Sequence, residues 1–113
     1  MALRNINGYT KVVLNIGDWD MDTTATLTVA HGLSATEWKT IRDVSVIIRN
    51  DADTFYYNLD QVSAVFPNPS ASWKSLNDTN LYLERIASGA FDTPTFSSTS
   101  YNRGWITLEY ISD

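Results

Sequence analysis

A strict alternation of side-chain type near the carboxyl end limits the possible folds more than any other feature. In residues 105–111, Ile106, Leu108 and Tyr110 fall on one face and the intervening residues fall on the other. A period of two, rich in β-branched and aromatic residues, is typical of a strand with one buried face. Burial of Ile106 and Leu108 stabilises such a strand by roughly 1.5–3 kcal/mol per side chain, before the conformational entropy lost on ordering is subtracted.

The same pattern recurs along the chain at short intervals. Strands are predicted over residues 9–16, 24–29, 44–49, 55–59, 72–76, 80–86 and 105–111. Two hairpins are expected, one across residues 50–54 and one across residues 77–79. Short strands, frequent turn signals and almost no amphipathic helix predict an all-β fold. We expect residues 1–113 to form one domain, an antiparallel, jelly-roll-like β-sandwich of about seven strands, with a small barrel as the near alternative.

Three connections have patterns of their own. Gly32 lies in a predicted turn, where glycine adopts positive φ at little cost. Residues 34–41 have the pattern of a single helical turn, with Ser34 as N-cap and Glu37 three residues later. Residues 60–71 are predicted to be irregular, because two prolines, at 67 and 69, exclude both a helix and a central strand.

The segment before the last predicted strand is a long polar loop with regularly spaced aromatic residues. Phe91, Phe96 and Tyr101 follow one another at intervals of five, separated by polar and small residues. Loops longer than about 12–15 residues are uncommon in compact domains unless they have a role. We expect these three side chains, together with Trp105, to anchor the loop to its own domain or to a neighbouring subunit.

Arg103 precedes the last strand in the motif Tyr-Asn-Arg-Gly-Trp. Its planar guanidinium can donate to several acceptors at once. We expect Arg103 to hold the loop by donating to backbone carbonyls or to Asp92, which is a structural role whether the loop packs on its own domain or on a neighbour.

Charge and composition disfavour several classes of partner. The 113 residues include 8 Lys and Arg against 13 Asp and Glu, a net charge of −5, and no cysteine. A basic footprint for nucleic acid is missing, and an anionic membrane surface would repel this chain. Neither a disulfide nor a thiolate metal site can form. No apolar run approaches the roughly 20 residues of a transmembrane helix, and the amino terminus lacks a signal-peptide core. We therefore expect no nucleic-acid partner and no membrane insertion.

Residues that carry chemistry are few. His31 is the only histidine, and it has no second His or Cys with which to share a metal, so a structural role in a turn is expected. No G-x-S-x-G elbow, dinucleotide fingerprint or P-loop occurs. The sequence therefore predicts no catalytic residue and no cofactor, with the paired acids of a small glycosidase as a distant alternative.

Three alternating carboxylates raise the question of an ion site. Asp18, Asp20 and Asp22 have the spacing that opens a calcium loop, but Thr23 and Val29 stand where the EF-hand pattern requires Gly and Glu. We expect a solvated loop between strands, with a weak ion site of different construction as the alternative.

Aromatic residues are numerous for a chain of this length, with four Trp, six Tyr and four Phe. Most such residues serve as core or interface anchors. The alternative is an exposed aromatic face that stacks on sugar rings or on a partner protein. The residues expected to make such contacts are Trp19, Tyr56 and Tyr57.

Four segments of the chain resemble small β-sandwich structural proteins of tailed bacteriophages. They are GDWDMD with AHGL in residues 17–33, VSVIIRNDADTFYYNL in 44–59, LYLERIASGAFD in 81–92 and TSYNRGWITLEY in 99–110. The resemblance covers most of the chain and concerns strands and turns, with no catalytic signature. It extends to the carboxy-terminal domains of tail fibres and to head-fibre and accessory virion subunits. Because the chain lacks coiled-coil heptads and a repetitive shaft, a decoration, adaptor or fibre-head protein is favoured over a full fibre.

The resemblance implies a non-enzymatic virion structural protein, made in the bacterial cytoplasm and located in the particle. Such proteins are usually homo-oligomers, and a trimer is favoured here. The expected partners are further copies of the chain, other virion proteins and, for an exposed subunit, a glycan of the host surface. A carbohydrate-binding module that uses exposed aromatic residues is the alternative function.

Overall fold

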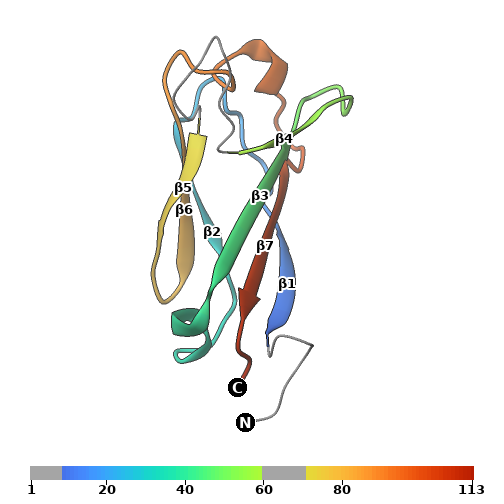
Figure 1. The fold of residues 1–113 in the computed structure, drawn as a ribbon. Helices are drawn as coiled ribbons and strands as arrows, with labels where there is room; N and C mark the ends of the chain where they lie inside the picture. Colours follow the sequence, from blue (N-terminus) through green and yellow to red (C-terminus); the bar gives the residue numbers. More distant parts are fainter. Residues whose placement is uncertain (1–8, 60–70) are drawn as a thin grey trace.

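Two antiparallel β-sheets packed face to face form the protein (Figure 1). A computed structural model describes residues 9–59 and 71–113. Over these residues the elements run in the order β1 (Thr10–Asn15), β2 (Thr26–Ala30), η1 (Glu37–Thr40), β3 (Asp43–Arg49), β4 (Tyr56–Asn58), β5 (Ala71–Leu76), β6 (Asn80–Arg85), η2 (Pro94–Phe96) and β7 (Gly104–Tyr110), where η marks a 3-10 helix. The predicted all-β sandwich of about seven strands is confirmed.

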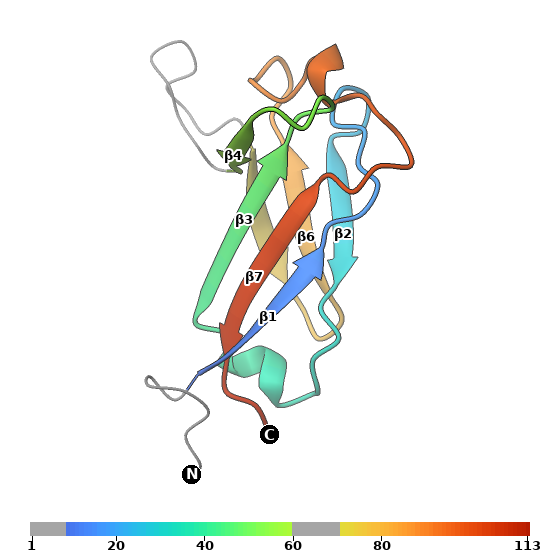
Figure 2. The same cartoon turned by 90° about the vertical axis from the view of Figure 1, so that its right-hand side faces the viewer.

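Strand order places the two predicted hairpins in different sheets. One sheet has the order β1-β7-β3-β4 and the other the order β2-β6-β5 (Figure 2). The orders β2-β6-β5 and β4-β3-β7 match those of strands B-E-D and C′-C-F in immunoglobulin-type sandwiches. Strand β1 occupies the position of strand G, antiparallel to β7. The first and last strands of the described chain are therefore neighbours in one sheet.

The core lies between the sheets and follows the period of two. Along β7, Ile106 and Leu108 are buried, and along β6 Leu81 and Leu83 are buried. Each predicted strand lies within two residues of the observed one. Ala25 lies in the predicted second strand, where alternation would place it on the same face as Leu27 and Val29, but it is exposed because β2 begins at Thr26. The predicted irregular segment lies outside the described residues, except for its last residue, which begins β5.

The loops are divided between the two ends of the sandwich. The β1–β2, β3–β4 and β6–β7 connections gather at one end, whereas η1 and the carboxyl terminus lie at the other (Figures 1 and 2). At the η1 end, the backbone N–H of Ser34 donates to Glu37 and the N–H of Glu37 donates to the Ser34 hydroxyl. The predicted contact between Ser34 and Glu37 is therefore present, but the prediction of Ser34 as N-cap is wrong: the helix begins at Glu37, is of the 3-10 type and has Thr36 at its N-cap. Gly32 has φ +71°, as its predicted turn requires.

Exposed sheet edges are protected by local features. Edge strand β5 has a bulge between Trp73 and Ser75, which places Lys74 out of register with β6. Edge strand β4 consists of three residues, and edge strand β1 carries Lys11. Bulges, short strands and lysine side chains all discourage the addition of a further strand to an edge. Strand β2, the other edge of the three-stranded sheet, has none of these features.

Close packing of the two central strands yields a test of the fold. Gly104 of β7 pairs with Ile48 of β3, and a Cβ at this position would overlap the carbonyl oxygen of Ile47 and lie 2.9 Å from its carbonyl carbon. We expect Gly104→Ala to lower the free energy of unfolding by about 1–3 kcal/mol in urea titrations. Ser45→Ala, on the exposed face of β3, should change it by less than about 0.5 kcal/mol. Equal stabilities of the two variants would contradict this packing.

Candidate functional site

Arg103 lies fully buried where the three loops of one end meet. Its Nε donates to the carbonyl of Trp19 over 3.0 Å, and its Nη1 donates to the carbonyl of Arg49 over 2.9 Å. Its Nη2 donates to Oδ1 of Asp51 over 2.8 Å and to the carbonyl of Ser98 over 3.4 Å. One side chain therefore joins the β1–β2 loop, the end of β3 and the β6–β7 loop.

Asp51 is the counter-ion of Arg103 and also orders the long loop. Its carboxylate accepts from the backbone N–H groups of Ser97 and Ser98 over 3.0 and 3.1 Å. Partial burial raises the pKa of Asp51, but the hydrogen bonds from Arg103, Ser98 and Ser97 outweigh it and hold the pKa below its ordinary value of 3.8. The carboxylate is therefore ionised at neutral pH, and a buried cation has its partner.

The prediction for Arg103 is confirmed for the backbone carbonyls and wrong for Asp92. Strand β7 pairs with β3 along its length, which brings Arg103 beside the turn that follows β3 and therefore beside Asp51. Asp92 instead pairs with Arg85 at the end of β6, over 3.4 Å, and accepts from the backbone N–H of Ser88.

Phe91 and Phe96 anchor the long loop to the core of their own chain. Both are buried, at 1% and 4% exposure, with ring centroids 5.1 Å apart in an edge-to-face arrangement. Tyr57 packs edge-on against both rings, with centroid distances of 5.8 and 5.7 Å. Of the two predicted roles, these phenylalanines therefore fill the loop-anchor role, and neither is exposed to a neighbouring subunit.

Two of the three residues predicted to contact a glycan or partner are placed inside the fold. Trp19 is 1% exposed, and its Nε1 donates to the carbonyl of Thr24. Tyr57 is half-buried and faces the phenylalanine pair, because it alternates with the outward-facing Tyr56 along β4. The prediction is therefore wrong for Trp19, which has no accessible surface to offer. Tyr57 is half-buried, and Tyr56 is 55% exposed.

Tyr56 belongs to a stack of four side chains on the outer face of the four-stranded sheet. We call this stack the ladder, and it consists of Tyr56, Trp105, Arg49 and Tyr101. The rings of Tyr56 and Trp105 are stacked, with centroids 5.9 Å apart and planes 8° apart. The Arg49 guanidinium lies 5.3 Å from the Trp105 ring centroid and 4.1 Å from that of Tyr101. Contacts of this kind combine cation–π attraction with dispersion between flat groups.

Hydrogen bonds hold both ends of the ladder. The Tyr101 hydroxyl donates to the carbonyl of Asn50 over 2.7 Å, and the Tyr56 hydroxyl donates to Asp53 over 2.6 Å. Asp53 also pairs with Arg49 over 3.3 Å. The Tyr56 hydrogen bond lowers the pKa of Asp53 and raises the pKa of Tyr56. The predicted anchors Tyr101 and Trp105 are therefore surface residues that order the loop from outside.

Around the ladder, the outer face of the four-stranded sheet is poor in charge. Val13 and Ile47 are 60% and 38% exposed on this face. The strand register aligns two rows across β1, β7 and β3, one of Asn15, Trp105 and Ile47 and one of Val13, Thr107 and Ser45. Charged residues appear only beyond these rows, where Lys11 pairs with Glu109 at one end and Arg49 pairs with Asp53 at the other.

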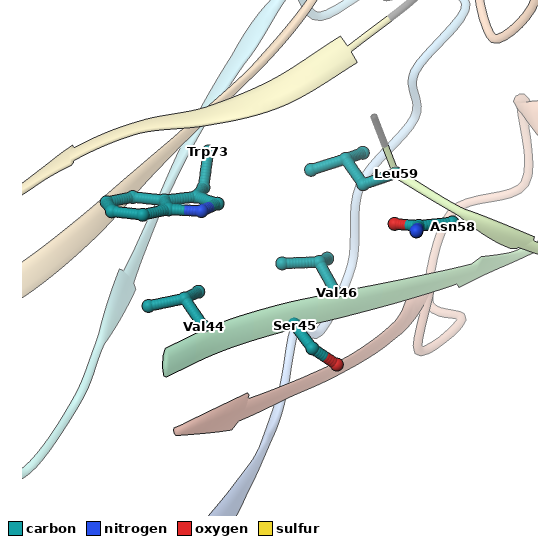
Figure 3. A pocket seen from close by; sticks show the side chains of 6 residues that line it. All are labelled: Val44, Ser45, Val46, Asn58, Leu59 and Trp73. Atoms are coloured by element: carbon teal, nitrogen blue, oxygen red, sulfur yellow. The ribbon is translucent and has the colours of Figure 1, made fainter. Parts of the chain in front are cut away.

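A hollow of about 100 Å³ lies between the sheets, lined by Val44, Ser45, Val46, Asn58, Leu59 and Trp73 (Figure 3). The side chains of Val44 and Val46 point toward Trp73, whereas Ser45 points away (Figure 3). Among these lining residues, no acid or base faces the hollow. The lining combines apolar side chains with the polar residues Ser45 and Asn58.

His31 is buried, and both of its ring nitrogens are used in hydrogen bonds. Nε2 lies 2.8 Å from the carbonyl oxygen of Asn77, and Nδ1 accepts from the backbone N–H of Leu33. These bonds tie the β2–η1 turn to the β5–β6 turn, which is a structural arrangement of the predicted kind.

The three alternating carboxylates do not converge on an ion site. Asp20 accepts from the backbone N–H groups of Asp22 and Thr23, which closes a local turn. Asp18 forms a backbone bridge with Asn102. Within residues 9–59 and 71–113, no three His, Cys, Asp or Glu side chains are grouped so as to hold a metal ion.

Comparisons with known proteins leave the function to be argued from the structure. No protein-family model, no curated protein and no solved structure matches the chain. In the described part of the chain, no helix has the length and apolar character needed to cross a bilayer.

Reasoning from the sequence missed the pairing of Arg103 with Asp51 and the stacking of Trp105 on Tyr56. The signal for the stack was present, since Trp105 falls on the face of its strand opposite to Ile106. The pairing with Asp51, 52 positions away, has no local signal.

Arg103 cannot be replaced by another cation without loss. The planar guanidinium of Arg103 donates to four acceptors in different directions. In Arg103→Lys, the single ammonium group cannot reach all four. We expect the free energy of unfolding in urea to fall by about 2 kcal/mol or more, because buried carbonyls lose their donors. Arg42→Lys, at an exposed position, is the control. Wild-type stability of Arg103→Lys would contradict the role assigned to this residue.

The depressed pKa of Asp51 predicts a pH dependence. Since the pKa is lower in the folded than in the unfolded chain, the stabilisation is complete above about pH 4 and is lost as the pH falls through the folded-state pKa. Urea unfolding of Asp51→Asn below pH 4 should therefore show a shallower dependence of stability on pH than the wild type. A wild-type slope in Asp51→Asn would refute the assignment.

Proposed function

We propose that this protein is a non-enzymatic structural subunit that associates with further copies of itself through the outer face of its four-stranded sheet. Its place is the virion of a tailed bacteriophage, as a fibre-head, decoration or adaptor subunit. The resemblance of four segments to phage β-sandwich proteins supports the virion part of the proposal. The character of the sheet face supports the part concerning association.

The difference between the two outer faces is the observation that carries the proposal. The face of the four-stranded sheet exposes Val13, Ile47 and the ladder. The face of the three-stranded sheet presents mainly threonine, serine and charged side chains, with a single tyrosine. Protein interfaces are enriched in Trp, Tyr and Arg and depleted of charge at their centre, inside a polar rim. Only the four-stranded face has this composition.

A second copy of the chain fits this face in charge as well as in apolar character. Each end of the face carries both an acid and a base, in the pairs Lys11–Glu109 and Arg49–Asp53. Asp43 lies opposite Glu109 and adds a further acid to the first end. These charged residues form a polar rim around an uncharged centre, as in protein interfaces. The ladder is already ordered by hydrogen bonds, so its side chains lose little further entropy on association.

A carbohydrate site on the same face is less well supported. A sugar stacks on an aromatic ring whose face is open to solvent. The rings of Tyr56 and Trp105 instead face one another, and Arg49 also contacts Trp105. The ladder therefore does not form a flat aromatic platform.

Light scattering of purified variants tests the association. We expect the wild type to have a mass that is a multiple of the 12.7 kDa of the chain, with a trimer favoured. Ile47→Asp places an unpaired carboxylate in the middle of the face and should reduce the mass to that of one chain. Thr28→Asp, an equivalent change on the other sheet, should leave the oligomer intact. A monomeric wild type, or an unaffected Ile47→Asp oligomer with a wild-type melting profile, would contradict the proposal.

The location has a separate test. Mass spectrometry of phage particles purified by density gradient should find the chain in stoichiometric amount. Its recovery only in the soluble fraction of infected cells would overturn the assignment to the virion, without bearing on self-association.

A further inference from the structure

We infer that the outer face of the three-stranded sheet carries a binding groove for a neutral saccharide. The groove there is shallow and open to solvent, with a volume of about 590 Å³. It is lined by Thr26, Leu27, Thr28, Lys74, Ser75, Tyr82, Leu83 and Glu84. This groove is independent of the face assigned to self-association and lies on the other sheet.

Alternation along the strands directs the polar lining outward. On β6, Tyr82 and Glu84 alternate with the buried Leu81 and Leu83. The register places Thr28 opposite Tyr82, and it places Thr26 opposite Glu84 in the same way. The bulge in β5 lies beside them, and bulges increase the local twist and bend the strand that contains them. The bend accounts for a hollow on a sheet face that would otherwise be flat.

The lining offers both kinds of contact that a sugar ring requires. The apolar C–H face of a pyranose packs on an aromatic ring, and the half-buried Tyr82 is the aromatic residue among those that line the groove. The Tyr82 hydroxyl accepts a hydrogen bond from the Nδ2 of Asn77 over 3.1 Å, and this bond restrains the ring. Sugar hydroxyls both donate and accept. Glu84 can accept from them, Lys74 can donate to them, and the threonine hydroxyls can do either.

The balance of charge selects a neutral ligand. Lys74 and Glu84 form an ion pair across the groove with an N···O distance of 3.3 Å. Since each charge already has its counter-ion, the groove offers no surplus of positive charge to a phosphate, a sulfate or a nucleic acid. The hydroxyl groups of a sugar can hydrogen-bond to the Lys74 ammonium and to the Glu84 carboxylate while the ion pair stays intact.

A shallow groove with one aromatic ring predicts weak binding by a single chain. Affinity of about millimolar order is expected, because few contacts must offset the loss of ligand freedom. An oligomer would present several grooves at once, and simultaneous engagement strengthens binding by orders of magnitude. The inference does not rest on the oligomer, since one chain contains the whole groove.

Nuclear magnetic resonance titration of the wild-type chain tests the inference. The probes are maltotriose, cellotriose, mannotriose, triacetylchitotriose and lactose, with inorganic phosphate and dextran sulfate as charged probes. We expect at least one neutral sugar to shift the backbone amides of β2, β5 and β6 around the groove, with Kd of about millimolar order. The charged probes should not shift them. The absence of shifts with all five sugars, or shifts confined to the ladder, would overturn the inference.

Variants locate the binding and separate it from folding. Glu84→Ala removes an acceptor from a partly exposed position, and Tyr82→Ala removes the ring; each should weaken binding at least tenfold. Tyr82→Phe, which keeps the ring, should retain most of the affinity even if Tyr82→Ala does not fold. Tyr56→Ala, on the ladder, should bind as the wild type does. Wild-type affinity in Glu84→Ala, or loss of affinity in Tyr56→Ala, would contradict the assignment.

Ile47→Asp tests self-association and lies on the other sheet, so it leaves the groove intact. The failure of self-association and the failure of sugar binding can therefore be told apart.

Discussion

The hydrogen bonds of one buried guanidinium determine the arrangement of the loop end. Arg103 is fully buried, so each of its donors needs an acceptor and its charge needs a partner. Three carbonyls and the Asp51 carboxylate accept from its Nε, Nη1 and Nη2 atoms. Three of these acceptors lie in loops and the fourth, the carbonyl of Arg49, lies at the end of β3, so one side chain holds three loops against the end of a strand. Asp51 extends the network by accepting from the backbone of the long loop.

The surface ladder depends on this buried network. The carbonyl of Arg49 accepts from Arg103, while the side chain of Arg49 points outward and contacts Tyr101 and Trp105. The Nε of Arg49 also donates to the carbonyl of Asn102, the residue before Arg103. An internal ion pair and an external stack are therefore connected through one residue of β3. This connection gives the outer face of the four-stranded sheet a fixed shape, which suits the self-association that we propose for it.

The sequence was sufficient for the strands and insufficient for the contacts between distant segments. Alternation of Ile106 and Leu108 with outward residues predicted β7, and the polar turns at 50–54 and 77–79 predicted both hairpins, because these signals are local. The partner of Arg103 depends on which strands are neighbours in the sheet, and that is a property of the whole chain.

Trp19 is a second residue whose location depends on distant parts of the chain. It was expected on an exposed aromatic face, yet its ring is in the core, and its backbone carbonyl accepts from Arg103. The groove beside Tyr82 likewise requires three strands and a bulge that no single segment encodes.

The central claim is that the two outer faces of one sandwich have separate uses, one for self-association and one open to ligand. Solvent paramagnetic relaxation, measured with a soluble gadolinium agent at increasing protein concentration, tests it most directly. The account predicts that the side chains of Val13, Ile47 and Trp105 become shielded as the concentration rises, while Thr26, Thr28 and Tyr82 remain as accessible as in the dilute protein. Shielding of the three-stranded face, or no change on the four-stranded face in an oligomeric sample, would contradict the claim.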